Sequence, residues 1–172
     1  MHPQIRQLLT ILDQAYDRKS WHGTNLRGSI RALTAGQVVW RPAPRRHNIQ
    51  ELVVHAAYWK YAVWRRLTGG DRGSFPLKGS NFFRRDAADP RVWRDDVALL
   101  GTMHARLREA VAGTLPARVD KPLPSSELMP LTLIAGIAAH DLYHAGQIQL
   151  LKTLQKDAAA KAVPASSCRR PS

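Results

Sequence analysis

The sequence predicts an all-α protein, a four-helix bundle whose helices are joined by long connections. Three observations support this fold class. Apolar residues recur at intervals of three and four in four stretches, no stretch alternates as a strand would, and a length of 172 residues suits one domain. Hydrophobic residues make up 44% and charged residues 23% of the chain, which excludes a wholly disordered protein.

The first half of the chain contains two of the predicted helices. The first covers residues 3–19, with a proline suited to its first turn, and residues 25–33 look like its continuation after an interruption. The second begins at Asn48, which forms a capping-box pattern with Glu51, and ends at the glycine pair 69–70. The connection that follows is long enough to suggest a functional loop.

The second half contains the other two helices. The third starts at Asp89, a capping residue followed by a first-turn proline. The fourth follows a proline-rich loop and runs to about Lys156. We therefore expect one domain over residues 1–156 and a disordered basic tail over residues 157–172, which are rich in Ala, Ser and Pro.

The single cysteine and the hydropathy pattern indicate the compartment. Cys168 is the only cysteine, so neither an intramolecular disulfide nor a cysteine-based metal site can form, and its place in the tail argues against a role as nucleophile. The N-terminus lacks the apolar core of a secretion signal, and no apolar run is long enough to cross a bilayer. We expect a cytoplasmic protein without membrane contacts.

The formal net charge of +13 raises nucleic acid as a partner. The distribution of the charge weakens that idea, because the arginine pairs are scattered over helix ends and loops and no helix carries a basic stripe interleaved with aromatic residues. We interpret the excess as a solvated, arginine-rich surface that helps to attract an anionic substrate, and we expect no specific nucleic acid.

The sharpest chemical signal is a pair of histidines in the fourth predicted helix. His140 and His144 are four residues apart, so their rings lie on one helical face and can converge on one metal ion. Both occupy inward positions, where two imidazoles need a shared partner that a cation supplies. His55, at the edge of the apolar stripe of the second helix, would complete a three-histidine site with one position open, as in catalytic sites.

Each of these histidines also has a plainer interpretation. An isolated pair at this spacing is common, and His55 taken alone fits a hydrogen-bonded core or boundary residue. His104 sits on an apolar stripe too, but it lacks a partner four residues away, so we expect it to be structural or partly exposed. His2 and His47, at helix entries, are expected to face solvent.

Other candidates surround this set. Asp141 is a candidate catalytic base or an orienting partner for a histidine, and Gln147 could bond a ligand, a metal-bound water or a neighbouring helix. Four residues are candidate walls of a cofactor or substrate pocket, with ordinary packing as the alternative for each: Trp21, His22, Trp59 and Phe82.

Two segments together resemble the DinB/YfiT-like superfamily of four-helix metalloproteins: residues 48–59 (NIQELVVHAAYW) and residues 140–148 (HDLYHAGQI). Residues 21–23 and 75–82 resemble segments of one branch, and the resemblance spans about residues 3–155. It implies that His55, His140 and His144 bind a divalent metal, commonly zinc or nickel, and that the protein is a homodimer. Some members transfer low-molecular-weight thiols such as bacillithiol or mycothiol to electrophiles, and others isomerise or hydrolyse small substrates.

Four functions follow from these observations. The first is a metal-dependent transferase that takes a low-molecular-weight thiol as co-substrate and a small electrophile as acceptor. The second is a metal-dependent hydrolase with Asp141 or another carboxylate as base. The third is a non-enzymatic stress-response or metal-binding protein. The fourth, which the charge distribution disfavours, is a nucleic-acid-binding protein.

Overall fold

The computed structural model describes residues 1–124 and 126–162, and within these residues it contains helices and no strands. The predicted all-α fold is therefore confirmed. The four long helices are α1 (Pro3–Tyr16), α4 (Ile49–Thr68), α5 (Pro90–Ala112) and α6 (Pro130–Ala162). Three short segments complete the fold: α2 (Leu26–Ser29), α3 (Ala35–Val39) and a 3₁₀ turn (Pro116–Arg118).

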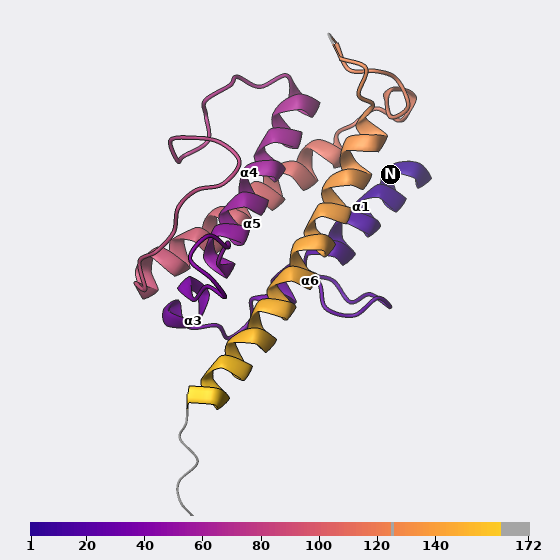
Figure 1. Ribbon diagram of the computed structural model, residues 1–172. Helices are drawn as coiled ribbons and strands as arrows, with labels where there is room; N and C mark the ends of the chain where they lie inside the picture. Colours follow the sequence, from indigo (N-terminus) through magenta and orange to yellow (C-terminus); the bar gives the residue numbers. More distant parts are fainter. Residues whose placement is uncertain (125, 163–172) are drawn as a thin grey trace, which may run out of the picture.

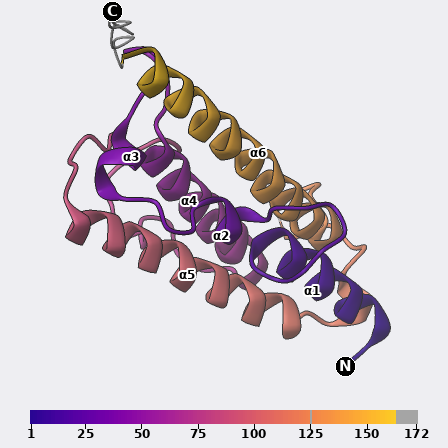
Figure 2. The same cartoon turned by 90° about the horizontal axis from the view of Figure 1, so that it is seen from below.

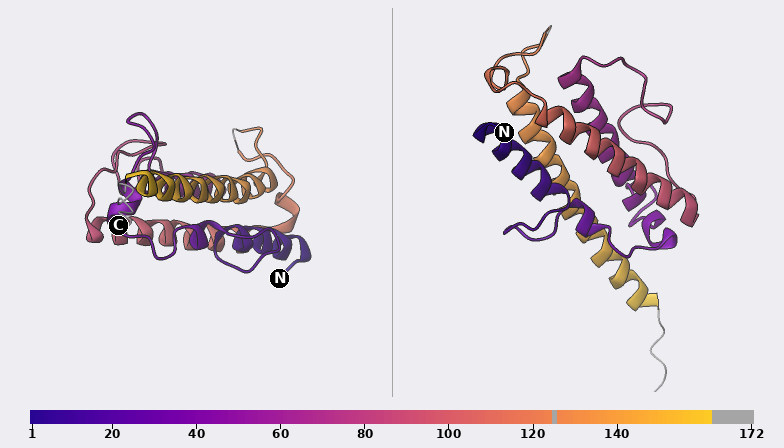
Figure 3. Two further views of the ribbon diagram at one scale, coloured as in Figure 1. Left: turned by 60° about the horizontal axis from the view of Figure 1, so that its bottom comes forward. Right: turned by 180° about the vertical axis from the view of Figure 1, so that it is seen from behind.

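The long helices form a bundle in which α4 and α5 run in the same direction (Figure 1). Gln50 donates to Asp96 near the start of both helices, and Arg106 lies over the ring of Trp64 toward their ends. The connection over residues 69–89 consequently returns along the bundle before α5 begins. α6 lies beside α4 in the opposite direction and covers the layer that contains α1 and α5 (Figures 2 and 3).

The predicted helix boundaries around α4 and α5 are confirmed by their caps. The Asn48 side chain accepts a hydrogen bond from the Glu51 amide, and Asp89 accepts from the Arg91 amide. Gly69 ends α4 in the left-handed region at φ 70°, which a residue without Cβ adopts at little cost. The reciprocal half of the capping box is not formed, because the Glu51 carboxylate binds Arg41 and His47 instead.

Three other boundaries differ from the prediction. α1 ends at Tyr16 rather than near residue 19, and within residues 25–33 only the single turn of α2 is helical. The short helix α3 was not predicted. α6 continues through Ala162, past the end expected near residue 156, so the first part of the predicted tail is helical. The rest of that tail, including Cys168, lies outside the described residues.

The core consists of two apolar clusters with a polar layer between them. One cluster lies around α3, the start of α4 and residues 75–83. The other joins the first turns of α1 and the ends of α4 and α5 to the start of α6. Lys60, Asp141 and His104 are buried and fall, along their helices, between the residues of the two clusters. None of the described helices combines the length and hydropathy that a membrane span requires.

Candidate metal centre

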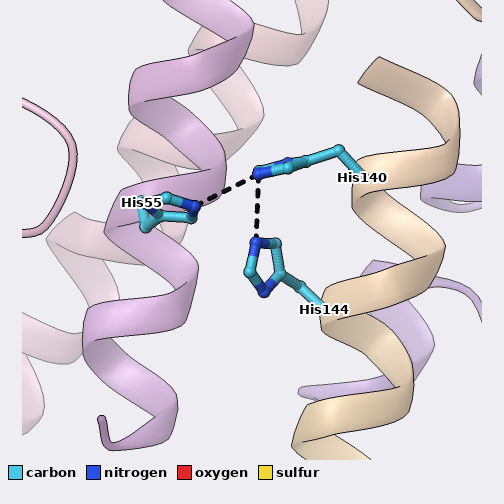
Figure 4. Close-up of side chains that lie close together, drawn as sticks. All are labelled: His55, His140 and His144. Carbon is cyan, nitrogen blue, oxygen red and sulfur yellow. Dashed lines mark hydrogen bonds between the residues drawn. The ribbon is translucent and has the colours of Figure 1, made fainter. Parts of the chain in front are cut away.

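Three imidazoles converge between α4 and α6 (Figure 4). The Nε2 atom of His140 lies 3.1 Å from Nε2 of His55 and 3.0 Å from Nε2 of His144. All three candidate ligand nitrogens lie within 4.8 Å of one another. Ligands at about 2.1 Å around a tetrahedral zinc ion are separated by about 3.4 Å, so the spacing is close to that of a three-histidine site.

The helices position these rings through simple periodicity. His140 and His144 are one turn apart on α6, and His55 faces them from the antiparallel α4. His55 and His144 are buried, whereas His140 is half-buried. The sequence-predicted set of three is thus brought together from two helices.

The loop residue Asn81 fixes the ring of His55. The Nδ1–H of His55 donates to the Asn81 carbonyl at 2.9 Å, and the indole of Trp59 donates to the Asn81 side chain at 3.1 Å. Asn81 has φ 65°, a conformation that Asn tolerates better than most residues. Because the proton is held on Nδ1, the Nε2 lone pair of His55 points into the cluster.

Gln147 fixes the ring of His144, as Asn81 fixes that of His55. The Nδ1–H of His144 donates to the Gln147 Oε1 at 2.7 Å. Its Nε2 therefore also carries a lone pair directed at His140. Gln147 contacts the outer nitrogen of a histidine, whereas the sequence suggested a contact with a ligand or a metal-bound water.

The protons of the cluster show that a cation fits between the three rings. Two Nε2 lone pairs, those of His55 and His144, face the single Nε2 of His140, which can donate at most one proton. A proton can therefore bridge at most one of the two short contacts, and the other has no hydrogen-bond donor unless a cation lies between the rings. The other ring nitrogen of His140, Nδ1, is buried and has no hydrogen-bond partner among the described residues. A set of three imidazoles suits several divalent metals, among them zinc, copper, iron and nickel.

Burial keeps these rings neutral. It lowers the pKa of His55 to about 4 and that of His140 to about 3, and it also lowers the pKa of His144. Neutral imidazole is the form that binds metals, so the three lone pairs are available at neutral pH without displacing protons.

Aromatic side chains surround the cluster. Phe82 stacks on His55 with ring centroids 4.0 Å apart, and His47 stacks on the opposite face of Phe82 at 3.7 Å. Trp59 meets His140 edge-on at 6.2 Å, and Tyr143 meets His144 at 5.1 Å. Two of the predicted wall residues, Trp59 and Phe82, therefore contact the histidines directly.

The other predicted residues lie elsewhere. Trp21 and His22 are in the connection between α1 and α2, where Trp21 is 95% exposed and His22 is also exposed. Asp141 is fully buried, and its carboxylate binds the ammonium of Lys60. A carboxylate without solvent contact and already paired with a cation is poorly suited to act as a base.

Two residues near the histidines had no signal in the sequence. Asn81 acts through its backbone carbonyl, which any residue type supplies, although the turn-forming run Gly79-Ser80-Asn81 could have indicated its left-handed conformation. Lys60 is fully buried, and lysine is rarely found in such a position.

Comparisons with known proteins give one match. The family model described as the DinB superfamily matches residues 19–148, well over half of the chain and including all three histidines. Neither the comparison with curated proteins nor the comparison with solved structures found a match.

Proposed function

The chain belongs to the DinB superfamily, and from that premise we propose that it binds a divalent metal ion through His55, His140 and His144 and transfers a low-molecular-weight thiol to small electrophiles. The observation that carries the metal site is the convergence of three Nε2 atoms whose outer nitrogens are held by Asn81 and Gln147 or left without a partner. Zinc and nickel are the expected metals.

The thiol-transfer proposal rests on the number of protein ligands. Three histidines leave a coordination position for an exogenous group. A divalent ion lowers the pKa of a bound thiol and so provides a thiolate at neutral pH. Cys168 is the only cysteine in the chain, and we expect the reacting thiol to come from a small co-substrate.

The residues of the chain bind and orient the reactants. The rings of Trp59 and Tyr143 offer apolar surface to an acceptor beside the histidines. With a chloroaromatic acceptor, a sulfur–carbon bond forms, the carbon–chlorine bond breaks, chloride leaves and the thiol proton passes to water. The half-buried face of His140 is where we expect both reactants to approach.

Metal analysis of the untagged protein tests the first part of the proposal. We expect about one equivalent of zinc or nickel in the wild type and a loss of stoichiometric metal in His55→Ala, His140→Ala and His144→Ala. The matched control is His22→Ala, which removes an exposed histidine of the α1–α2 connection and should keep the metal. Normal metal content in the His140→Ala and His144→Ala variants would refute the assignment.

Turnover assays test the second part. Metal-loaded protein is incubated with bacillithiol, mycothiol or glutathione and a chlorodinitrobenzene acceptor, with His144→Ala as the blank. A thiol-dependent rate above the blank supports the transferase. Water-dependent turnover without thiol would instead identify a metallohydrolase, and bound metal without any turnover would identify a metal-binding protein.

The homodimer expected for this family has a candidate surface on α6. Tyr143, Leu150 and Leu154 are 64%, 59% and 39% exposed and recur at spacings of seven and four along one side of the helix. We place the contact with the second copy there, because such a stripe is costly to leave in water. Leu150→Lys should convert a dimer to a monomer in light-scattering measurements, whereas an unchanged mass would locate the contact elsewhere.

A further inference from the structure

A basic depression lies at the end of the bundle away from the histidines. It has a volume of about 920 Å³ and is formed by the last turns of α4 and α5, the 3₁₀ turn and the connection that leads into α6. Arg65 lies ten residues beyond His55 on α4, a distance of about 15 Å along the helix axis. Five cationic side chains line the depression: Arg65, Arg66, Arg72, Arg118 and Lys121.

The positive charge of this depression is not balanced by carboxylates. No acidic side chain is among the described residues that line it, and within residues 1–124 and 126–162 none of the five cations takes part in an ion pair. Asp71, Asp120 and Glu127 belong to the same connections but are exposed and do not line the depression.

The charge also extends beyond the depression itself. A neighbouring hollow of about 670 Å³ shares Arg65, Arg66 and Arg72 and adds Lys78. Cations that gather around one concave surface reinforce each other's potential more than the same number spread over a convex surface.

Helix dipoles do not account for the number of cations. The C-terminal ends of α4 and α5 reach the depression, and cations near such ends are ordinarily stabilising. Each end contributes about half a negative charge, and the N-terminal end of α6 contributes the opposite sign. The sum offsets only a small part of five positive charges, so an anion of several charges remains favoured.

The size and lining of the depression indicate the class of anion. Its volume is within the range of small-molecule sites, about 300–1,000 Å³. The described residues that line it include no aromatic side chain for a nucleobase to stack on; Tyr58, Tyr61 and Phe75 line only the neighbouring hollow. The two-pronged guanidinium group of arginine matches the oxygen geometry of a phosphate group. Four arginines line the depression. We propose that the depression is a binding site for a compact multivalent anion with two or three linked phosphate groups.

Calorimetric titration with inorganic tripolyphosphate tests this site. The site variant is Arg66→Gln/Arg118→Gln, which removes two exposed charges of the lining. The matched control is Arg91→Gln/Lys156→Gln, which removes two exposed charges outside it. We expect saturable binding at 50 mM salt that weakens at least about tenfold in the site variant and less than about threefold in the control.

Three results would overturn the proposal. They are the absence of saturable binding to the wild type at 50 mM salt, an equal loss in the two double variants, and tighter binding of a single-stranded oligonucleotide that the site variant does not weaken. The titration is repeated with His144→Ala, because polyphosphate also binds metal ions. An unchanged affinity in that variant is expected, and a lost affinity would assign the binding to the metal centre instead.

Discussion

Two buried polar contacts join α4 to α6. One pairs opposite charges, and the other brings neutral groups together. One is the ion pair of Lys60 with Asp141, and the other is the histidine cluster, in which His55 meets two rings of α6. In the ion pair, each charge is the partner of the other. In the histidine cluster, three neutral groups present lone pairs to a common centre, and one contact has no proton to bridge it.

This difference separates a contact that holds the fold from one that holds a ligand. Lys60 and Asp141 are both fully buried, and the ammonium also lies 4.9 Å from the ring centroid of Tyr16. Burial raises the pKa of Asp141, and the ammonium of Lys60 acts against that rise. The histidine cluster, by contrast, is not fully buried, because His140 is only half-buried.

The largest expected effect breaks the ion pair. Lys60→Met leaves the carboxylate of Asp141 buried without its cation, and the free energy of unfolding should fall by about 3–5 kcal/mol in urea denaturation. The double variant Lys60→Met/Asp141→Leu should recover most of this loss, since it removes both charges. The exposed Lys156→Met is the control, with a change within about 0.5 kcal/mol. A loss below about 1 kcal/mol in Lys60→Met would contradict the burial described for the pair.

The next effect concerns the histidines. Adding zinc or nickel at a hundred times its dissociation constant should raise the free energy of unfolding of the wild type by about 2.7 kcal/mol. In His144→Ala this rise should disappear, because two imidazoles remain. Thermal melts with and without metal, followed by circular dichroism, measure both. An equal rise in variant and wild type would show that the metal binds elsewhere on the protein.

A smaller effect is expected from Gln147, which holds the outer nitrogen of His144. Gln147→Leu removes this acceptor, keeps a similar volume and should weaken metal affinity by about ten- to a hundredfold. Gln149→Leu, two residues further along α6, is the matched control, because Gln149 contacts Thr24 and no histidine. Competition with a chromogenic chelator gives the affinities, and equal values for the two variants would remove Gln147 from the site.

The smallest expected effect is a dependence of stability on pH that comes from the buried polar layer around Lys60. His104 stacks on Tyr16, and burial lowers its pKa to about 3. In the unfolded chain His104 takes up a proton near pH 6.5, whereas in the folded chain it stays neutral. The contribution of neutral His104 to the free energy of unfolding is therefore present above that pH and is lost as the pH falls below it.

Each pH unit below about 6 should cost about 1.4 kcal/mol for this single group. Urea denaturation at pH 6 and pH 5 measures the slope. The ligand histidines add to the slope in both proteins, so the difference between the wild type and His104→Leu isolates His104. His104→Leu should reduce the slope by about that amount. An unchanged slope would mean that another group titrates in this range.

Local signals were sufficient to predict much of the fold. The caps at Asn48 and Asp89 and the glycine after α4 are read from single residues whose side chains or backbone freedom act within one turn. The helical end of α6 was missed because its alanines resemble a low-complexity tail in composition, although alanine has the highest intrinsic helix propensity.

In the candidate site, too, local patterns predict one part and tertiary contacts decide the other. The pairing of His140 with His144 follows from helical spacing, and the place of His55 follows from an apolar stripe that must face inward. The partners that orient the rings depend on tertiary contacts. A backbone carbonyl at Asn81 and the partner of Asp141, which lies 81 positions away in sequence, have no local pattern that could reveal them.

The connection between α4 and α5 contributes to both ends of the bundle. Arg72 lines the basic depression, and nine positions later Asn81 holds the ring of His55. A change in the length of this segment would therefore disturb the lining of the depression and the hydrogen bond that orients His55 together.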